Sequence, residues 1–209
     1  MKIFLATNNR QKGEEIISIF GKEGDWEFLF PEDLGLRFSV VEDGSSFAEN
    51  AYKKAMTGFL LTGLPTMGED SGLLIDYLKG LPGIKSHRFA GKETPFQEKI
   101  EGILKLLKGI PREERRAIFK CTICFVFSFK KILFFEGLCE GSIAFLPKGK
   151  FGFGYDPIFI PKGFKKTFGE LGPKIKNRVS HRAKAIKKLK KYLSNLIVLG
   201  RKNERNKTS

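Results

Sequence analysis

At positions 66–76 the chain reads Thr66-Met67-Gly68-Glu69-Asp70-Ser71-Gly72-Leu73-Leu74-Ile75-Asp76. We expect one strand over residues 66–70 and a second over 73–76, with Gly72 permitting a tight turn between them. Because side chains alternate along a strand, Glu69 and Asp70 would point to opposite faces. Two adjacent carboxylates at a strand end are either neutralised by a divalent cation or solvated in an acidic turn. The residues alone favour neither interpretation.

The residues before this segment predict strands and helices in alternation. Strands are expected at residues 3–6, 26–30 and 38–41. A helix is expected over residues 11–20, with Ile16, Ile17 and Phe20 on one face. Ser46-Phe47-Ala48-Glu49 has the pattern of a capping box, which opens a helix that extends to about residue 61.

The residues after this segment continue the same alternation. A helix is expected at 96–108, strands at 117–129, 132–139 and 141–145, and a last helix at 181–199. Residues 200–209 are expected to form a basic, flexible tail. Without a linker or an internal repeat, residues 1–199 predict a single α/β domain built on a mixed, elongated sheet.

Composition limits the class of protein. The 209 residues are 41% hydrophobic and 29% charged, as in an ordinary globular protein. The apolar runs are far shorter than the roughly 18 residues of a membrane span, and the N-terminus lacks the apolar length of a signal peptide. Cys121 and Cys124 would point to opposite faces of a strand, which predicts buried reduced thiols rather than a zinc or redox pair. These features predict a cytoplasmic protein with no membrane segment.

The net charge of +15 is concentrated at the C-terminus. Residues 162–209 hold 16 Lys or Arg and two acidic residues, a net charge of +14. A positive surface attracts nucleic acid and nucleoside triphosphate alike, so charge does not choose between them. Because the chain lacks a helix-turn-helix, RNA-recognition or zinc-finger pattern, a nucleic-acid-binding module is the weaker alternative.

A polar loop follows the first expected strand. It consists of Thr7, Asn8, Asn9, Arg10, Gln11 and Lys12. Free backbone N–H groups and the positive end of a helix suit phosphate at such a position, and Lys12 adds a charge. The glycines of a Walker A loop are missing, and simple helix capping explains the same residues.

Three further groups of residues suit a bound nucleotide. Glu42 ends an expected strand and by itself is more typical of a solvated loop residue, but with Asp70 it can supply the one or two carboxylates that Mg²⁺ takes from protein beside substrate phosphates. In Gly152-Phe153-Gly154-Tyr155-Asp156-Pro157 the glycines bare an aromatic ring on which a planar ligand can lie, although an aromatic hairpin corner has the same pattern. Lys176, His181 and Arg182 lie near a helix N-terminus, where anions are favoured.

In this order, these segments resemble the inosine triphosphate pyrophosphatase family, also called the Ham1-like or non-canonical purine NTP pyrophosphatases. The resemblance extends from Lys2 to about Leu196. The matching stretches are Leu5-Ala6-Thr7-Asn8 with Lys12 and Glu15; Ser46 to Ala51 with Lys54-Ala55; Glu69 to Leu73; Gly80-Leu81-Pro82-Gly83; Phe151 to Phe159; and Ser180-His181-Arg182. Their joint order and spacing are what make the resemblance specific.

The resemblance implies hydrolysis of ITP, dITP and XTP to the monophosphate and pyrophosphate, which cleanses the nucleotide pool. It also implies a Mg²⁺ cofactor, a homodimer, and two lobes around a central cleft. Asp70 would be the general base and a metal-site residue, and Glu42 a metal ligand. The phosphates would be held by Thr7, Asn8, Asn9, Arg10, Gln11, Lys12 and Ser71, and the nucleoside by Phe153, Gly154, Tyr155, Asp156, Lys176, His181 and Arg182.

The chain departs from the family pattern at three places. Glu69 replaces the usual first Asp of Asp-Asp-Ser-Gly, and Ile175 stands where an acidic residue often precedes Lys176. Ser86-His87-Arg88-Phe89 replaces Ser-Ala-Arg-Tyr, so His87 is interpreted as a surface substitution. A third interpretation keeps the scaffold and changes the substrate to modified pyrimidine triphosphates, as in the distantly related Maf-like enzymes.

Overall fold

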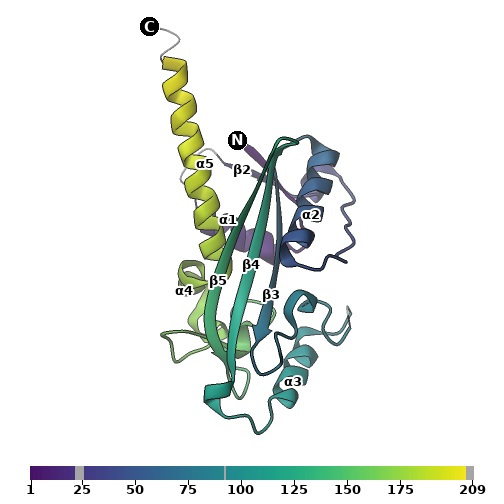
Figure 1. Cartoon of the computed structure of the whole chain (residues 1–209), viewed down its shortest axis with the longest axis vertical. Helices are drawn as coiled ribbons and strands as arrows, with labels where there is room; N and C mark the ends of the chain where they lie inside the picture. The colour runs from purple at the N-terminus through teal and green to yellow at the C-terminus, as the bar shows by residue number, and fades with distance from the viewer. Residues whose placement is uncertain (22–25, 92, 206–209) are drawn as a thin grey trace.

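The computed structural model describes residues 1–21, 26–91 and 93–205, with side chains up to residue 196 (Figure 1). In this part of the chain six strands form one mixed sheet in the order β2-β1-β3-β4-β5-β6. The strands are β1 (Lys2–Leu5), β2 (Glu27–Leu29), β3 (Thr66–Ile75), β4 (Arg116–Ser128), β5 (Lys131–Ile143) and β6 (Phe159–Pro161). The helices are α1 (Arg10–Phe20), α2 (Phe47–Thr62), α3 (Phe96–Leu106), α4 (Phe168–Val179) and α5 (His181–Arg205), with short 3-10 turns η1 (Glu32–Leu34), η2 (Gly83–Lys85), η3 (Arg112–Glu114) and η4 (Asp156–Ile158).

The sheet is built on three long antiparallel strands. β1 pairs in parallel with β2 and β3, whereas β3, β4, β5 and β6 follow one another antiparallel. β4 has 13 residues and is therefore about 40 Å long. The expected mixed, elongated α/β sheet is confirmed.

β3 corrects the prediction of two short strands broken at Gly72. It pairs with β4 without interruption from Thr66 opposite Val126 to Ile75 opposite Ala117. Gly72 is needed for close approach rather than for a turn, because a Cβ there would lie 2.2 Å from the carbonyl oxygen of Gly83. The turn at η2 therefore crosses over the middle of the strand.

Two large hydrophobic cores lie at the two ends of these strands. One contains Ile3, Ile16, Phe20, Phe125 and Leu189, and joins β1, α1, β4 and α5. The other contains Leu73, Ile103, Phe119, Ile143, Phe159 and Phe168, and joins β3, β4, β5, β6, α3 and α4. A smaller core packs Ala51 and Ala55 of α2 on Cys124 and Val126. α2 and α5 thus cover opposite faces of the sheet, as Figure 1 shows.

Four other elements differ from the sequence predictions. Residues 38–41 form no strand; Phe38 packs its ring edge-on to Phe4 instead. β5 is one strand and not two, and α4, with a kink at Gly172 and Pro173, was not predicted. α5 continues to Arg205, past the predicted end at residue 199, and residues 206–209 of the predicted tail lie outside the described part.

The cysteines agree with their prediction. Cys121, Cys124 and Cys139 are free and buried. Cys121 belongs to the core under α5 and Cys124 to the core under α2, so the two thiols point to opposite faces. Burial raises the pKa of Cys124 to about 12 and that of Cys139 to about 11, which leaves both thiols protonated near neutral pH.

Candidate functional site

The acidic segment lies at the middle of β3, between the two large cores. Two cavities border it. The carboxylate cavity, of about 480 Å³, is lined by Glu42, Lys54 and Asp70. The aromatic pocket, of about 70 Å³, is lined by Phe153, Lys176 and Arg182. Their shared wall consists of Asn9, Lys12, Ser71 and His87.

Glu69 points away from the carboxylate cavity and is buried among cations. Its Oε1 accepts a hydrogen bond from Arg182 at 2.9 Å, and its Oε2 lies 3.1 Å from Nζ of Lys12. Burial alone would raise the pKa of Glu69, but Arg182 and Lys12 hold the pKa well below the usual range. Arg182 also donates to Oγ of Ser71 at 3.0 Å. Glu69 therefore fixes the positions of two cations at the wall of the site.

A second group of buried charges joins α1, α4 and α5. Oε2 of Glu15 accepts from Lys176 at 3.0 Å and from Arg182 at 3.1 Å. Lys176 also donates to Oδ2 of Asp156 at 2.7 Å, and the same oxygen accepts from the backbone N–H of Phe153 at 2.9 Å. The Phe153 ring lies 4.4 Å from Nζ of Lys176 and 5.5 Å from the guanidinium carbon of Arg182. The aromatic loop is thus tied to the cations beside it.

Asp70 faces α2 on the other side of the strand. Its Oδ1 lies 3.4 Å from Nζ of Lys54, and its Oδ2 accepts from Nδ2 of Asn50 at 3.1 Å. Lys54 also lies 3.0 Å from Oε2 of Glu42 and donates to the carbonyl of Glu69 at 3.2 Å. Burial raises the pKa of Asp70, although Lys54 and Lys12 oppose the rise. Asp70 and Glu42 therefore share one buried cation, and the expected opposite directions of Glu69 and Asp70 are confirmed.

The loop after β1 forms the opening of α1. Asn9 is the N-cap, and its Oδ1 accepts from the backbone N–H of Lys12 at 2.9 Å. Oγ1 of Thr7 accepts from the backbone N–H of Asn9, and Nδ2 of Asn8 donates to the carbonyl of Phe38. Thr7, Asn8, Asn9 and Lys12 all line the carboxylate cavity. The residues that cap α1 therefore also line the carboxylate cavity.

Two predicted phosphate contacts lie elsewhere. Arg10 is exposed, pairs with Glu14 and Glu32, and lines neither cavity. Gln11 is exposed and lines a third cavity behind Phe153. The helix face explains both positions, because Asn9 and Lys12 turn toward the sheet while Arg10 and Gln11 turn toward solvent.

His181 is buried at the start of α5. Its ring stacks on Phe119 with centroids 4.7 Å apart. Burial, with Arg182 and Lys176 nearby, lowers the pKa of His181 well below its usual value, so the imidazole is neutral. Its Nδ1 has no hydrogen-bond partner in the described structure. Gly137 permits this arrangement, because a Cβ there would lie 2.0 Å from the carbonyl oxygen of His181.

Three residues of the site have roles that were not predicted from the sequence. Lys54 and Asn50 hold Asp70, and Glu15 holds Lys176 and Arg182. The sequence did contain a signal for two of them, because Asn50 and Lys54 are polar residues at i and i+4 on the otherwise apolar, buried face of a helix. The remaining predicted residues Gly154, Tyr155 and Asp156 line the aromatic pocket, where Tyr155 donates to the carbonyl of Ser86 at 2.8 Å.

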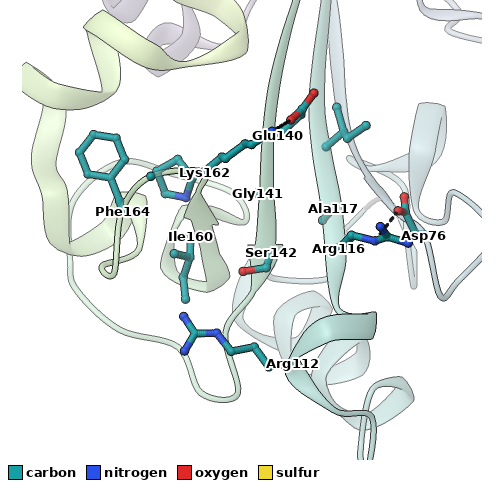
Figure 2. Close-up of a pocket in the computed structure, with 13 residues that line it drawn as sticks. Asp76, Arg112, Arg116, Ala117, Glu140, Gly141, Ser142, Ile160, Lys162 and Phe164 are labelled. Carbon is teal, nitrogen blue, oxygen red and sulfur yellow. Dashed lines mark hydrogen bonds and ion pairs between the residues drawn. The ribbon is translucent and has the colours of Figure 1, made fainter.

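The cavity in Figure 2 is a separate one. It has about 540 Å³, lies where β4, β5 and β6 adjoin, and contains none of the predicted site residues. Arg116 pairs with Asp76 and Lys162 with Glu140, as the dashed lines show, so most of its charge is neutralised internally. We therefore assign the functional site to the two cavities beside β3.

These features define a two-core α/β protein with a carboxylate cavity and an aromatic pocket that share one wall. A model of the Ham1 family matches residues 3–192. The dITP/XTP pyrophosphatase of Desulforamulus reducens is 41% identical over 198 residues, which cover 95% of this chain and 98% of the relative. The dITP/XTP pyrophosphatase of Bacillus subtilis is 41% identical over 189 residues, or 90% and 95% of the two chains.

Solved structures agree with the sequence match. A HAM1 protein from Coxiella burnetii has a TM-score of 0.84 and 36% identity, and the match covers 93% of this chain and 99% of that one. The Ham1 protein of Staphylococcus aureus has a TM-score of 0.83 and 34% identity, with the same coverage. The chain belongs to the Ham1 family.

Proposed function

We propose that this protein hydrolyses the non-canonical purine nucleoside triphosphates ITP, dITP and XTP to the monophosphate and pyrophosphate. One observation supports this most: the carboxylate cavity with Glu42 and Asp70 and the aromatic pocket with Phe153 meet at a common wall. Such an arrangement suits a ligand with a planar base at one end and a metal-bound phosphate chain at the other. The relatives named dITP/XTP pyrophosphatase support the same activity.

The carboxylate cavity fits the proposed Mg²⁺ cofactor. Glu42 and Asp70 are oxygen donors, and both reach the same ammonium group of Lys54. Among the described residues no group of three His, Cys, Asp or Glu side chains could hold a metal ion. Mg²⁺ commonly binds through one or two protein carboxylates together with water and substrate phosphates, and the bound ion would neutralise charge on the phosphate oxygens.

The residues of the site would then have different roles in the displacement of pyrophosphate by water at the α-phosphorus. Asp70 would accept a proton from the water that attacks the α-phosphorus. Lys12 and Ser71 would bind the phosphate oxygens, where negative charge develops as pyrophosphate leaves. Lys54 and Asn50 would keep the Asp70 carboxylate in position.

The aromatic pocket would supply the preference for a 6-oxo purine. The base would lie against Phe153, and donors such as Arg182 or backbone N–H groups would face the oxygen at position 6. Adenine would place its amino donor opposite those donors. Each hydrogen bond left unmade costs about 1–3 kcal/mol, which lowers kcat/KM for ATP by roughly 5- to 150-fold.

The test is pyrophosphate release across a panel of nucleotides. With Mg²⁺ we expect ITP, dITP and XTP to be hydrolysed far faster than ATP, GTP or modified pyrimidine triphosphates, and EDTA to abolish the activity. Asp70→Asn should reduce turnover roughly 10²- to 10⁴-fold while nucleotide binding persists. Asp43→Asn is the control, since Asp43 is an exposed partner of Lys53. A panel without any hydrolysis, or preference for a pyrimidine, would exclude the proposal.

The proposal extends to a homodimer that acts in the cytoplasm. Phe134 and Leu138 are 49% and 46% exposed and lie on one face of β5, where a second subunit would bury them. The three reduced cysteines suit a reducing compartment, and none of the described helices meets the length and apolarity that a membrane crossing requires. Light scattering after size exclusion would detect the dimer, and Phe134→Glu should dissociate it; a wild-type monomer would exclude it.

A further inference from the structure

His87 lies at the place where the two cavities meet. It lines both of them, together with Asn9, Lys12 and Ser71. If the base occupies the aromatic pocket and the phosphates occupy the carboxylate cavity, the sugar has to pass along this shared wall. The step rests on the proposed function, because it takes the ligand to be a nucleoside triphosphate.

Ser86 and the backbone of His87 are held by hydrogen bonds from three parts of the chain. Oγ of Ser86 accepts from the backbone N–H of Leu73 on β3 at 2.9 Å, and the carbonyl of Ser86 accepts from the Tyr155 hydroxyl at 2.8 Å. The buried Lys99 of α3 donates to the carbonyl of His87 itself. None of these contacts involves the imidazole. They fix the backbone from which the side chain projects and leave both ring nitrogens available to a ligand.

His87 is exposed, and its imidazole packs against one aromatic ring. Phe96 makes a T-shaped contact with it, with centroids 5.9 Å apart. The imidazole ring lines the same cavity as Lys12, Glu42 and Lys54. Burial, followed by Lys99 and Lys12, lowers the pKa of His87, so the ring is neutral at pH 7.

A neutral imidazole offers one donor and one acceptor. A sugar hydroxyl also donates and accepts, so the two groups can match each other fully. Phosphate oxygens only accept, and the charged Lys12 on the same wall would be a stronger donor to them than a neutral imidazole. The chemistry of the ring therefore fits the sugar better than the phosphates.

We propose that His87 is a substrate-binding residue that hydrogen-bonds the sugar hydroxyls of the bound nucleotide. It occupies a position at which the family pattern has Ala, so the contact would distinguish this chain from relatives that follow the pattern. A residue that binds the sugar would contact neither the attacking water nor the leaving group, so we expect His87 to contribute to binding and not to the chemical step.

The experiment compares His87→Ala, His87→Gln and wild type on ITP, dITP and the 2′,3′-dideoxy analogue. For ITP, His87→Ala should raise KM about 3- to 10-fold with kcat within 2-fold, the effect of losing one neutral hydrogen bond. The effect should disappear on the dideoxy analogue, which has no hydroxyl to contact. His87→Gln, which keeps a donor and an acceptor, should recover part of the affinity.

Lys85→Ala is the control, because Lys85 is exposed on the same segment and lines neither cavity. It should leave KM unchanged, and all variants should retain the wild-type thermal midpoint. An unchanged KM in His87→Ala, or an equal loss on all three sugars, would overturn this inference while wild-type turnover leaves the proposed function intact. A wild-type enzyme that hydrolyses none of them would overturn both.

Discussion

Glu69→Gln tests whether the buried ion pairs of Glu69 stabilise the site. The Glu69 side chain is 4% exposed, and its carboxylate meets Arg182 at 2.9 Å and Lys12 at 3.1 Å. The amide has the same shape but no charge, so one charge-assisted hydrogen bond becomes an ordinary one and the other is lost, because the amide NH2 group cannot accept from a cation. Each change removes about 1–1.5 kcal/mol, and the free energy of unfolding should fall by about 2–3 kcal/mol at pH 7. Arg182 keeps Glu15 as a partner, which prevents a larger loss.

The contribution of Glu69 to the free energy of unfolding depends on pH. The pKa of Glu69 is well below its unfolded value of 4.5, so the folded carboxylate binds fewer protons than the unfolded one. Its contribution to stability is therefore complete above pH 4.5 and is lost as the pH falls toward the folded pKa. The difference between wild type and Glu69→Gln should be constant from pH 6 to 8 and should shrink below about pH 4.5.

Thermal unfolding followed by circular dichroism provides the measurement. A loss of 2–3 kcal/mol corresponds to a midpoint lower by about 4–12 °C for a chain of this size. Glu27→Gln is the matched control, because the Lys2–Glu27 pair is more than half exposed on both sides and should have no measurable effect. Equal midpoints for wild type and Glu69→Gln at pH 7, or a difference that persists unchanged at pH 4, would refute the reasoning.

Three further predictions concern the same site. Lys54→Met should lower turnover at least about 10-fold, because Asp70 loses the cation that positions it. Pyrophosphate release would measure this, with the half-buried neighbour Lys53→Met as control, and a variant with wild-type turnover would contradict it. Gly72→Ala should destabilise the fold by several kcal/mol, because its Cβ would lie 2.2 Å from a backbone carbonyl; an unchanged urea midpoint would contradict it. Phe153→Ala should raise KM for ITP roughly 5- to 150-fold, by loss of base stacking; kinetics with ITP would show it, and an unchanged KM would exclude the stacking.

Short sequence patterns correctly predicted where two helices begin, because helix capping depends on neighbouring residues. Asn9 and Ser46 both cap the helices that were expected after them, and Gly63 ends α2 in the left-handed conformation. Phe38 shows the limit of such patterns. Residues 38–41 have strand-like side chains, but in the described part of the chain they pair with no strand, and the side chain of Asn8 bonds to the carbonyl of Phe38. Strand formation depends on a distant partner, which local sequence does not contain.

The same limit applies to the site. Gly72 was interpreted as a turn residue, because glycine in a turn and glycine at a close approach look alike in sequence. Lys54 and Glu15 fall on regular helix faces, and their roles follow from the strand or helix that packs opposite them. Asp70 and Phe153 were found because each belongs to a short motif whose chemistry is local. Residues that act by holding others need the tertiary structure to reveal them.

The charges of the carboxylate cavity lead to one more conclusion about its ligand. The lining of this cavity holds the cations Lys12, Lys54 and Arg88 and the anions Glu42 and Asp70. Glu69 points away from the cavity but pairs with Lys12, so three cations are balanced by three anions. In the aromatic pocket Lys176 and Arg182 are likewise paired with Asp156 and Glu15. A triphosphate would bring several negative charges into a site whose own charges are already balanced, so it has to arrive with positive charge of its own. This balance supports the proposal that substrate binds together with Mg²⁺, and it predicts weak binding of the free nucleotide when EDTA is present.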